Sequence, residues 1–75
     1  MITPSGIGQA VRQARKAMGL RQDEFAAAAG VGLRFLVELE RGKPTIQLGR
    51  ALAVLAAAGL DLQLTGRRPT PETTS

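Results

Sequence analysis

The 75-residue sequence contains no cysteine, no histidine, no tryptophan and no tyrosine, and only two phenylalanines. Without cysteine, neither a disulfide nor a thiolate metal site can stabilise the fold, and without histidine the other common zinc ligand is missing. A single domain of this size buries only about 60% of its unfolded surface, so its core is marginal. Association between copies of the chain is the remaining route to extra stability.

The same absences exclude most enzyme chemistry. The candidate acids and bases are six scattered Asp and Glu residues, and no Gly-rich phosphate loop is present. We therefore expect no catalytic activity, no cofactor and no metal site. No apolar run approaches the roughly 20 residues of a membrane span. Residues 1–6 lack the basic stretch and apolar stretch of a signal peptide, so we expect a cytoplasmic protein.

The net charge of the chain is the first feature that indicates a binding partner. Ten Lys and Arg residues against six Asp and Glu residues give a net charge of +4 and a pI near 11.2. A small basic domain suggests a polyanionic partner, of which nucleic acid is the first candidate. The alternative is that the charge serves only solubility. Phe25 and Phe35 do not form a base-stacking platform, so a single-stranded nucleic acid is not expected.

Apolar residues spaced three and four apart, interrupted by glycines, predict four short helices. The first helix is capped by Thr3 or Ser5, ends at Gly19, and is weakened in its first turn by Gly6 and Gly8. Its apolar face comprises Ile7, Ala10, Val11, Ala14 and Met18. The second helix covers residues 22–29 and closes at Gly30, and the third covers residues 32–41.

The fourth predicted helix is capped by Thr45 and ends at Ala58, before Gly59. Its predicted buried face comprises Leu48, Ala51, Leu52 and Leu55. The period then changes, because residues 60–65 alternate apolar and polar side chains as a strand does: Leu60, Asp61, Leu62, Gln63, Leu64 and Thr65. A lone strand leaves its backbone unpaired, and the sequence offers no second one. The same strand of a second copy is the simplest partner, which predicts a homodimer. We expect residues 1–65 to form the domain and residues 66–75 to be a disordered tail.

The second and third helices form one unit, with a sharp turn between them at Gly30. Ala26 is small where these helices cross. Units of this kind place the second helix of the pair in the major groove of DNA. The core predicted to lie between the two helices comprises Phe25, Ala29, Val31, Leu36 and Leu39.

At these residues the sequence resembles the Xre/Cro-type helix-turn-helix repressors, and among them the HipB-like antitoxins. Residues 19–26, GLRQDEFA, are similar to the family's second-helix signature, and residues 36–45, LVELERGKPT, to the end of its recognition helix and the loop beyond. The similarity covers roughly residues 6–65. It implies an all-α, lambda-repressor-like domain of four to five helices, with a C-terminal strand paired across a homodimer. It also implies an autoregulating antitoxin with a HipA-like kinase toxin as partner, the alternative being a free-standing regulator without a toxin.

The resemblance implies a set of DNA contacts. Gln22 corresponds to a glutamine that holds a DNA phosphate, and the neighbouring Arg21 is assigned with it. The base-reading positions are Leu33, Arg34, Val37 and Glu38. Arg34 can make two hydrogen bonds to guanine or instead be a solvated charge, and Glu38 can accept from cytosine or repel phosphates. Leu33 and Val37 can contact thymine methyl groups, although Leu33 can equally turn towards the core.

Three further positions belong to the same expected surface. Gly32 replaces the usual Ser or Thr cap of the recognition helix and removes one phosphate contact. Arg41 and Lys43 follow that helix, where a DNA backbone would pass. The resemblance also implies a partly buried ion pair between Arg15 and Glu40, with a structural role. The expected function is therefore a repressor that binds a palindromic operator in double-stranded DNA.

Overall fold

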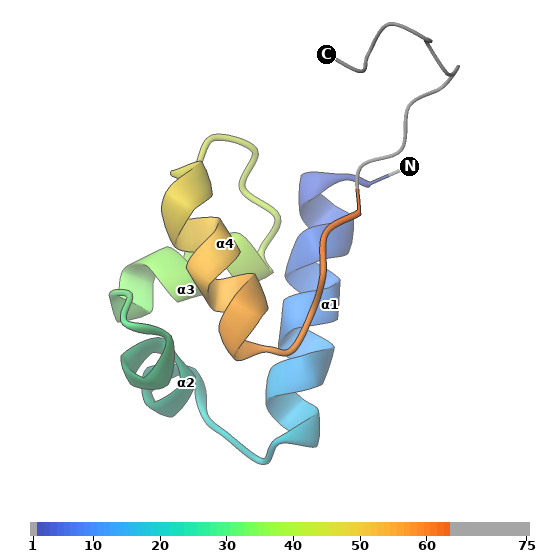
Figure 1. Ribbon diagram of the computed structural model, residues 1–75. Helices are drawn as coiled ribbons and strands as arrows, with labels where there is room; N and C mark the ends of the chain where they lie inside the picture. Colours follow the sequence, from blue (N-terminus) through green and yellow to red (C-terminus); the bar gives the residue numbers. More distant parts are fainter. Residues whose placement is uncertain (1, 64–75) are drawn as a thin grey trace, which may run out of the picture.

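Four short helices make up the part of the chain that the computed structural model describes, residues 2–63 (Figure 1). They are α1 (Pro4–Ala17), α2 (Gln22–Ala29), α3 (Leu33–Glu40) and α4 (Leu48–Ala57). The predicted all-α class is confirmed, with four helices in the described range. None of these helices combines the length and the apolar character that a membrane span needs.

The first helix begins where the sequence predicts. Thr3 is its N-cap, because the Oγ1 atom of Thr3 accepts a hydrogen bond of 2.9 Å from the backbone N–H of Gly6. Pro4 follows at the first helical position, where its missing N–H costs nothing. Met18 is the C-cap and is 45% exposed, so it does not belong to the buried face that was predicted for this helix.

The turn between α2 and α3 depends on Gly30. This residue has a φ of 76°, a conformation that residues with a Cβ atom rarely adopt. The chain then turns back on itself, and the N–H of Val31 donates to the carbonyl of Ala26 at 3.0 Å. This hydrogen bond closes the C-terminal end of α2 shortly before α3 begins, as the helix-turn-helix prediction requires.

The core lies between the four helices. Its fully buried members are Val11, Phe25, Leu36, Leu39 and Val54. Helix α3 packs against α1 and α2, and α2 also packs against α4. The predicted core positions Phe25, Leu36 and Leu39 are confirmed, whereas Ala29 and Val31 are only partly buried.

Helices α1 and α3 approach closely at Gly8, on α1. A Cβ atom built on this glycine would lie 2.5 Å from the carbonyl oxygen of Leu39 and 2.7 Å from that of Glu40. Gly8 is buried against the end of α3. Its lack of a side chain lets α1 approach α3, a role that the sequence pattern did not indicate.

The fourth helix differs from its prediction in its start and in half of its buried face, since Ala51 and Leu55 are buried as predicted. Its N-cap is Gln47 and not Thr45. Leu48 and Leu52, predicted to be buried, are 67% and 44% exposed. The residues that face the core are Ala51, Val54, Leu55 and Ala58. The helix is apolar on most of its surface, so packing against α2 decides which side is buried.

After α4 the chain runs back alongside α1 (Figure 1). Residues 60–63 have no regular secondary structure, so the strand predicted over residues 60–65 is absent from them. A strand needs a neighbour for its backbone hydrogen bonds, and the described part of one chain supplies none. Leu64, Thr65 and the predicted tail over residues 66–75 lie outside the described residues, and pairing across a dimer stays a prediction.

Candidate nucleic-acid interface

Helix α3 presents one outward face, formed by Leu33, Arg34, Val37 and Glu38. Leu33 is 47% exposed, and the side chain of Arg34 is 90% exposed. Val37 and Glu38 are half-buried. Leu33 therefore does not turn into the core, which decides between the two orientations that the sequence left open.

Glu38 lies between two cations on this face. Its carboxylate is 3.7 Å from Nε of Arg34, one turn earlier, and 3.3 Å from Nζ of Lys43, in the loop after α3. The structure thus brings three of the predicted DNA contacts together. In the free protein the carboxylate offsets part of the positive charge that Arg34 and Lys43 would offer to DNA.

Arg15 and Glu40 form a two-pronged ion pair between α1 and α3. Nε of Arg15 is 2.7 Å from one carboxylate oxygen of Glu40, and Nη2 is 3.1 Å from the other. The remaining guanidinium nitrogen donates to the carbonyl of Leu20 at 2.9 Å. The two side chains are only 10% and 4% exposed. Hydrogen bonding to Glu40 raises the pKa of the Arg15 guanidinium above its ordinary value, and burial opposes this effect.

Gln22 joins the same cluster. It is the first residue of α2, and its side-chain amide donates to Glu40 at 3.1 Å. One buried carboxylate therefore connects α1, α2 and α3. Among the described residues no buried side-chain polar atom lacks a hydrogen-bond partner. The Gln22 side chain consequently has a defined orientation before any ligand binds.

An open, polar hollow of about 310 Å³ lies beside this cluster. It is lined by residues of α1, the start of α2 and the end of α3: Arg12, Arg15, Gln22, Val37, Glu40 and Arg41. Gln22, Val37 and Arg41 were predicted from the sequence as DNA contacts. Here they surround one space, next to the outward face of α3.

Arg21 lies apart from both groups, as the N-cap of α2. Its exposed guanidinium is 3.2 Å from Asp23 and 3.8 Å from Glu24. Hydrogen bonding to Arg21 lowers the pKa of the Asp23 carboxyl below its ordinary value. Glu24 caps the helix, because its carboxylate accepts from the backbone N–H of Arg21 at 2.8 Å. Gly32 is the N-cap of α3 and has no side chain with which to cap it.

A helix-turn-helix family model matches residues 11–64, which is more than half of the chain. The chain belongs to this helix-turn-helix family. It is 55% identical over 62 residues to the uncharacterized HTH-type transcriptional regulator y4mF of Sinorhizobium fredii, a match that covers 83% of this chain and 82% of that protein.

Two solved structures share the fold of this helix-turn-helix protein. One is "MDT Protein" and the other is a "HipB-O4 20mer complex", each with a TM-score of 0.76 and 19% sequence identity. Each match covers 91% of this chain and 96% of the other. The helix-turn-helix family predicted from the sequence is confirmed, and the HipB-like resemblance is confirmed as a likeness of fold. Because helix-turn-helix domains bind DNA, this is a DNA-binding protein, and the prediction that it is not an enzyme agrees with its family.

One residue that lines the polar hollow of this helix-turn-helix protein was not singled out from the sequence. Arg12 lines the polar hollow but does not lie in the segments that carry the family resemblance. A signal for it exists, because Arg12 and Arg15 are three residues apart and so share a face of α1. The ion pair expected between Arg15 and Glu40 already placed this face of α1 against the end of α3, so the same signal could have indicated Arg12.

Proposed function

We propose that this protein is a transcriptional repressor that binds a palindromic operator as a homodimer. The observation that carries the proposal is the outward face of α3, where Arg34 stands 90% exposed beside Leu33 on a helix that is fixed through the buried Arg15–Glu40 pair. An exposed arginine on a rigid helix can make two hydrogen bonds to guanine in the major groove. The regulator role is supported by the name of the S. fredii relative.

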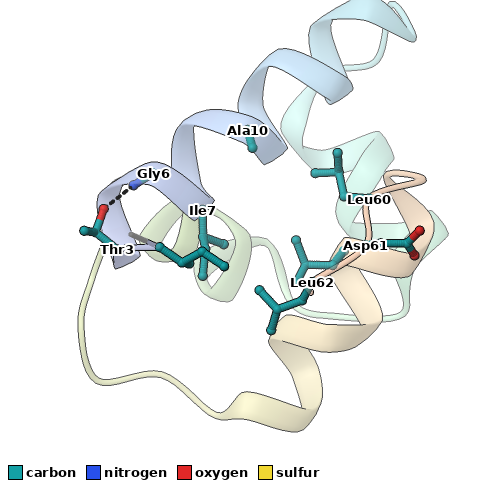
Figure 2. Close-up of a pocket in the computed structure, with 9 residues that line it drawn as sticks. Thr3, Gly6, Ile7, Ala10, Leu60, Asp61 and Leu62 are labelled. Carbon is teal, nitrogen blue, oxygen red and sulfur yellow. Dashed lines mark hydrogen bonds between the residues drawn. The ribbon is translucent and has the colours of Figure 1, made fainter. Parts of the chain in front are cut away.

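A second copy is proposed because one face of the chain remains partly open. An apolar hollow of about 320 Å³ lies between the first half of α1 and the segment after α4. Figure 2 shows Ile7 of α1 on one side of it and Leu60 and Leu62 on the other, while the carboxylate of Asp61 points away from Ile7. Pairing of residues 60–65 with the same residues of a second chain would extend this face and hold two α3 helices about 34 Å apart.

DNA binding is tested with a duplex from the region upstream of the protein's own gene, in a fluorescence anisotropy titration over a series of salt concentrations. We expect binding to weaken steeply as salt rises, because each phosphate contact releases counterions. A duplex of the same composition in scrambled order should bind about a thousandfold more weakly or worse. Salt-independent binding, or equal affinity for both duplexes, would contradict the proposal.

We propose further that the repressor is the antitoxin of a toxin–antitoxin pair, with a HipA-like kinase toxin as its protein partner. The support is the HipB-like sequence pattern together with the shared fold of the HipB chain. Footprinting of the upstream DNA with and without the product of the adjacent gene tests this role. A partner toxin should co-purify with the protein and change the footprint. If the neighbouring gene encodes no kinase and its product leaves the footprint unchanged, the protein is a free-standing regulator.

A further inference from the structure

We propose that Glu38 determines specificity as an internal counter-ion: it keeps Arg34 and Lys43 from the phosphates of unrelated DNA and frees them where a base donates a hydrogen bond to its carboxylate. The base group that can donate is a major-groove amino group, which cytosine and adenine carry. This inference rests on the proposed function and concerns how the protein rejects the wrong DNA. The sequence-based alternatives for Glu38 treat its carboxylate alone, whereas the structure gives it two cationic partners.

The backbone places Lys43 beside Glu38. The N–H of Lys43 donates to the carbonyl of Glu38 at 3.1 Å, and the N–H of Gly42 donates to that of Leu39 at 3.0 Å. These two bonds, with a φ of 84° at Gly42, form a Schellman motif at the end of α3. Nζ of Lys43 donates to the Glu38 carboxylate at 3.3 Å. The turn of the backbone therefore brings the two side chains together before DNA is present.

The second cation lies one helical turn before Glu38. Nε of Arg34 is 3.7 Å from the carboxylate oxygen that Lys43 does not contact. The side chain of Glu38 is 33% exposed, against 90% for Arg34 and 43% for Lys43. Glu38 is thus the most sheltered member of the group, and the two cations are the members that DNA phosphates can reach.

The fold gains little from a carboxylate at this position. Glu38 lies in the last turn of α3, where the negative end of the helix dipole disfavours an acidic residue. Ion pairs between exposed side chains also contribute little to stability. Stability therefore does not account for Glu38, whereas its place on the outward face of α3 relates it to DNA.

DNA phosphates and Glu38 compete for the same two cations. On unrelated DNA, Arg34 and Lys43 bind phosphates only by leaving Glu38, whose half-buried carboxylate then faces a polyanion without a partner. On the operator, a base amino group donates to that carboxylate, so it keeps a partner while the cations bind DNA. The penalty falls on the wrong sequences, which raises specificity without raising affinity.

The test compares Glu38→Gln with the control Glu24→Gln on the upstream duplex and on its scrambled counterpart. Both variants lose one negative charge, but Glu24 lies in the first turn of α2 and pairs with Arg21. Glutamine can take the place of glutamate in a capping box, so the control keeps its helix cap. Circular dichroism melting checks that both variants are folded.

We expect Glu38→Gln to bind the scrambled duplex about tenfold more tightly than the wild type, because a dimer frees two cations in each chain. Its salt slope on that duplex should steepen by about 0.9 for each cation that gains a phosphate. Affinity for the upstream duplex should rise by less than about threefold, so the preference for this duplex falls. Glu24→Gln should leave the preference unchanged.

A double-mutant cycle shows whether Glu38 acts through Lys43. Lys43→Gln and the double variant with Glu38→Gln complete the cycle. In the Lys43→Gln background, the gain from Glu38→Gln on the scrambled duplex should be smaller by about threefold. An unchanged gain would mean that the carboxylate repels phosphates directly, which contradicts the proposal.

A further measurement identifies the amino group. Cytosines and adenines of the upstream duplex are replaced in turn by analogues that lack the amino group. At one position in each half-site, the replacement should weaken the wild type about tenfold but leave Glu38→Ala, which has no acceptor, nearly unchanged. The base at that position shows whether cytosine or adenine is read.

The proposal is overturned if Glu38→Gln behaves like Glu24→Gln, if it tightens binding to both duplexes equally, or if no replaced base distinguishes the wild type from Glu38→Ala. A wild type that binds the two duplexes equally, or binds neither, overturns the proposed function instead. The two failures are therefore distinguishable.

Discussion

Gly8 shows how one missing side chain determines the geometry of the site. Its buried position on α1 lies against the last carbonyls of α3. Those carbonyls belong to a helix end and cannot move aside as a flexible side chain could. The close crossing brings the two helices near enough for Arg15, two turns further along α1, to reach Glu40 at 2.7 Å. The orientation of Gln22 therefore depends indirectly on a glycine.

Replacement of Gly8 by alanine is expected to lower the free energy of unfolding by about 1–3 kcal/mol, because the new Cβ atom would overlap backbone atoms of α3. Urea denaturation monitored by circular dichroism measures the change. Gly49→Ala is the matched control, since a Cβ atom at this helical glycine would meet nothing within 4 Å. The control should be neutral or more stable by up to about 1 kcal/mol. Equal stability of the two variants would show that the crossing tolerates a side chain.

Gly8 and Gly30 differ in how well their structural roles can be predicted from the sequence. Gly30 follows a helical run and precedes another, so local pattern alone predicts a turn with positive φ. Gly8 lies against a segment more than thirty residues later in the chain, and a pattern of neighbouring residues cannot predict that contact. The Arg15–Glu40 pair was expected only through the family resemblance, which carries tertiary information.

Among the helices, α3 starts at a residue that gives little sequence evidence for a helix N-terminus. Gly32 has the extended backbone of an N-cap, with a φ of −72° and a ψ of 153°, but no side chain accepts a hydrogen bond from the first turn. The helix has only eight residues, so its stability comes from packing of Leu36 and Leu39. Helix α3 is thus stabilised by packing of its buried face and not by a side-chain cap at its N-terminus.

Gly32→Ser should supply the missing cap. A Cβ atom at this position meets nothing within 4 Å, and a serine oxygen could accept from the exposed N–H groups of α3. We expect a gain of a few tenths of a kcal/mol in the free energy of unfolding, because glycine is itself a tolerable cap. Gly32→Ala is the comparison and should be less stable than Gly32→Ser by about 1 kcal/mol. A serine variant no more stable than the alanine variant would show that α3 does not use this position as a cap. Thermal melting of the three proteins measures both differences.

Helix existence was predictable here, but helix orientation was predictable only where polar residues mark one side. In α3 the charged residues Arg34, Glu38 and Arg41 define the outward face, and the predicted and observed faces agree. In α4 almost every residue is apolar, so the pattern places Ala51 and Leu55 correctly but takes Leu48 and Leu52 as buried in place of Val54 and Ala58. Packing against α2 decides which side of α4 is buried. This contact cannot be seen in a short stretch of sequence.

For the molecule as a whole, the segment after α4 is the part whose secondary structure the sequence alone predicts least well. The alternation predicted from residues 60–63 is present in their burial, since Leu60 and Leu62 are half-buried and Asp61 and Gln63 are exposed. The two leucines pack against the edge of the core. Alternation reports which side chains face inward, whereas a strand is defined by backbone hydrogen bonds, which here require a second chain. The sequence pattern is therefore right about burial and leaves pairing as a prediction.

Gln63→Pro tests that pairing directly. The backbone N–H of Gln63 donates to no described residue, and its side chain is exposed, so proline should leave the fold of the single chain intact. It would, however, remove a donor from a strand paired across the dimer axis. We expect sedimentation equilibrium at micromolar concentration to show a shift from dimer towards the 7.9 kDa monomer. Gln63→Thr keeps the N–H and favours extended backbone, so it should remain dimeric.

The two variants should also differ in how they bind a palindromic duplex. A monomer carries one α3 helix, so Gln63→Pro should bind a single half-site as well as it binds the palindrome, whereas Gln63→Thr should retain the preference for two half-sites a helical turn apart. Half-site binding with unchanged thermal melting would place the defect in assembly and not in folding. If instead Gln63→Pro remains a dimer and keeps the palindrome preference, residues 60–65 do not pair across the axis, and the apolar hollow of Figure 2 would be a feature of the single chain alone.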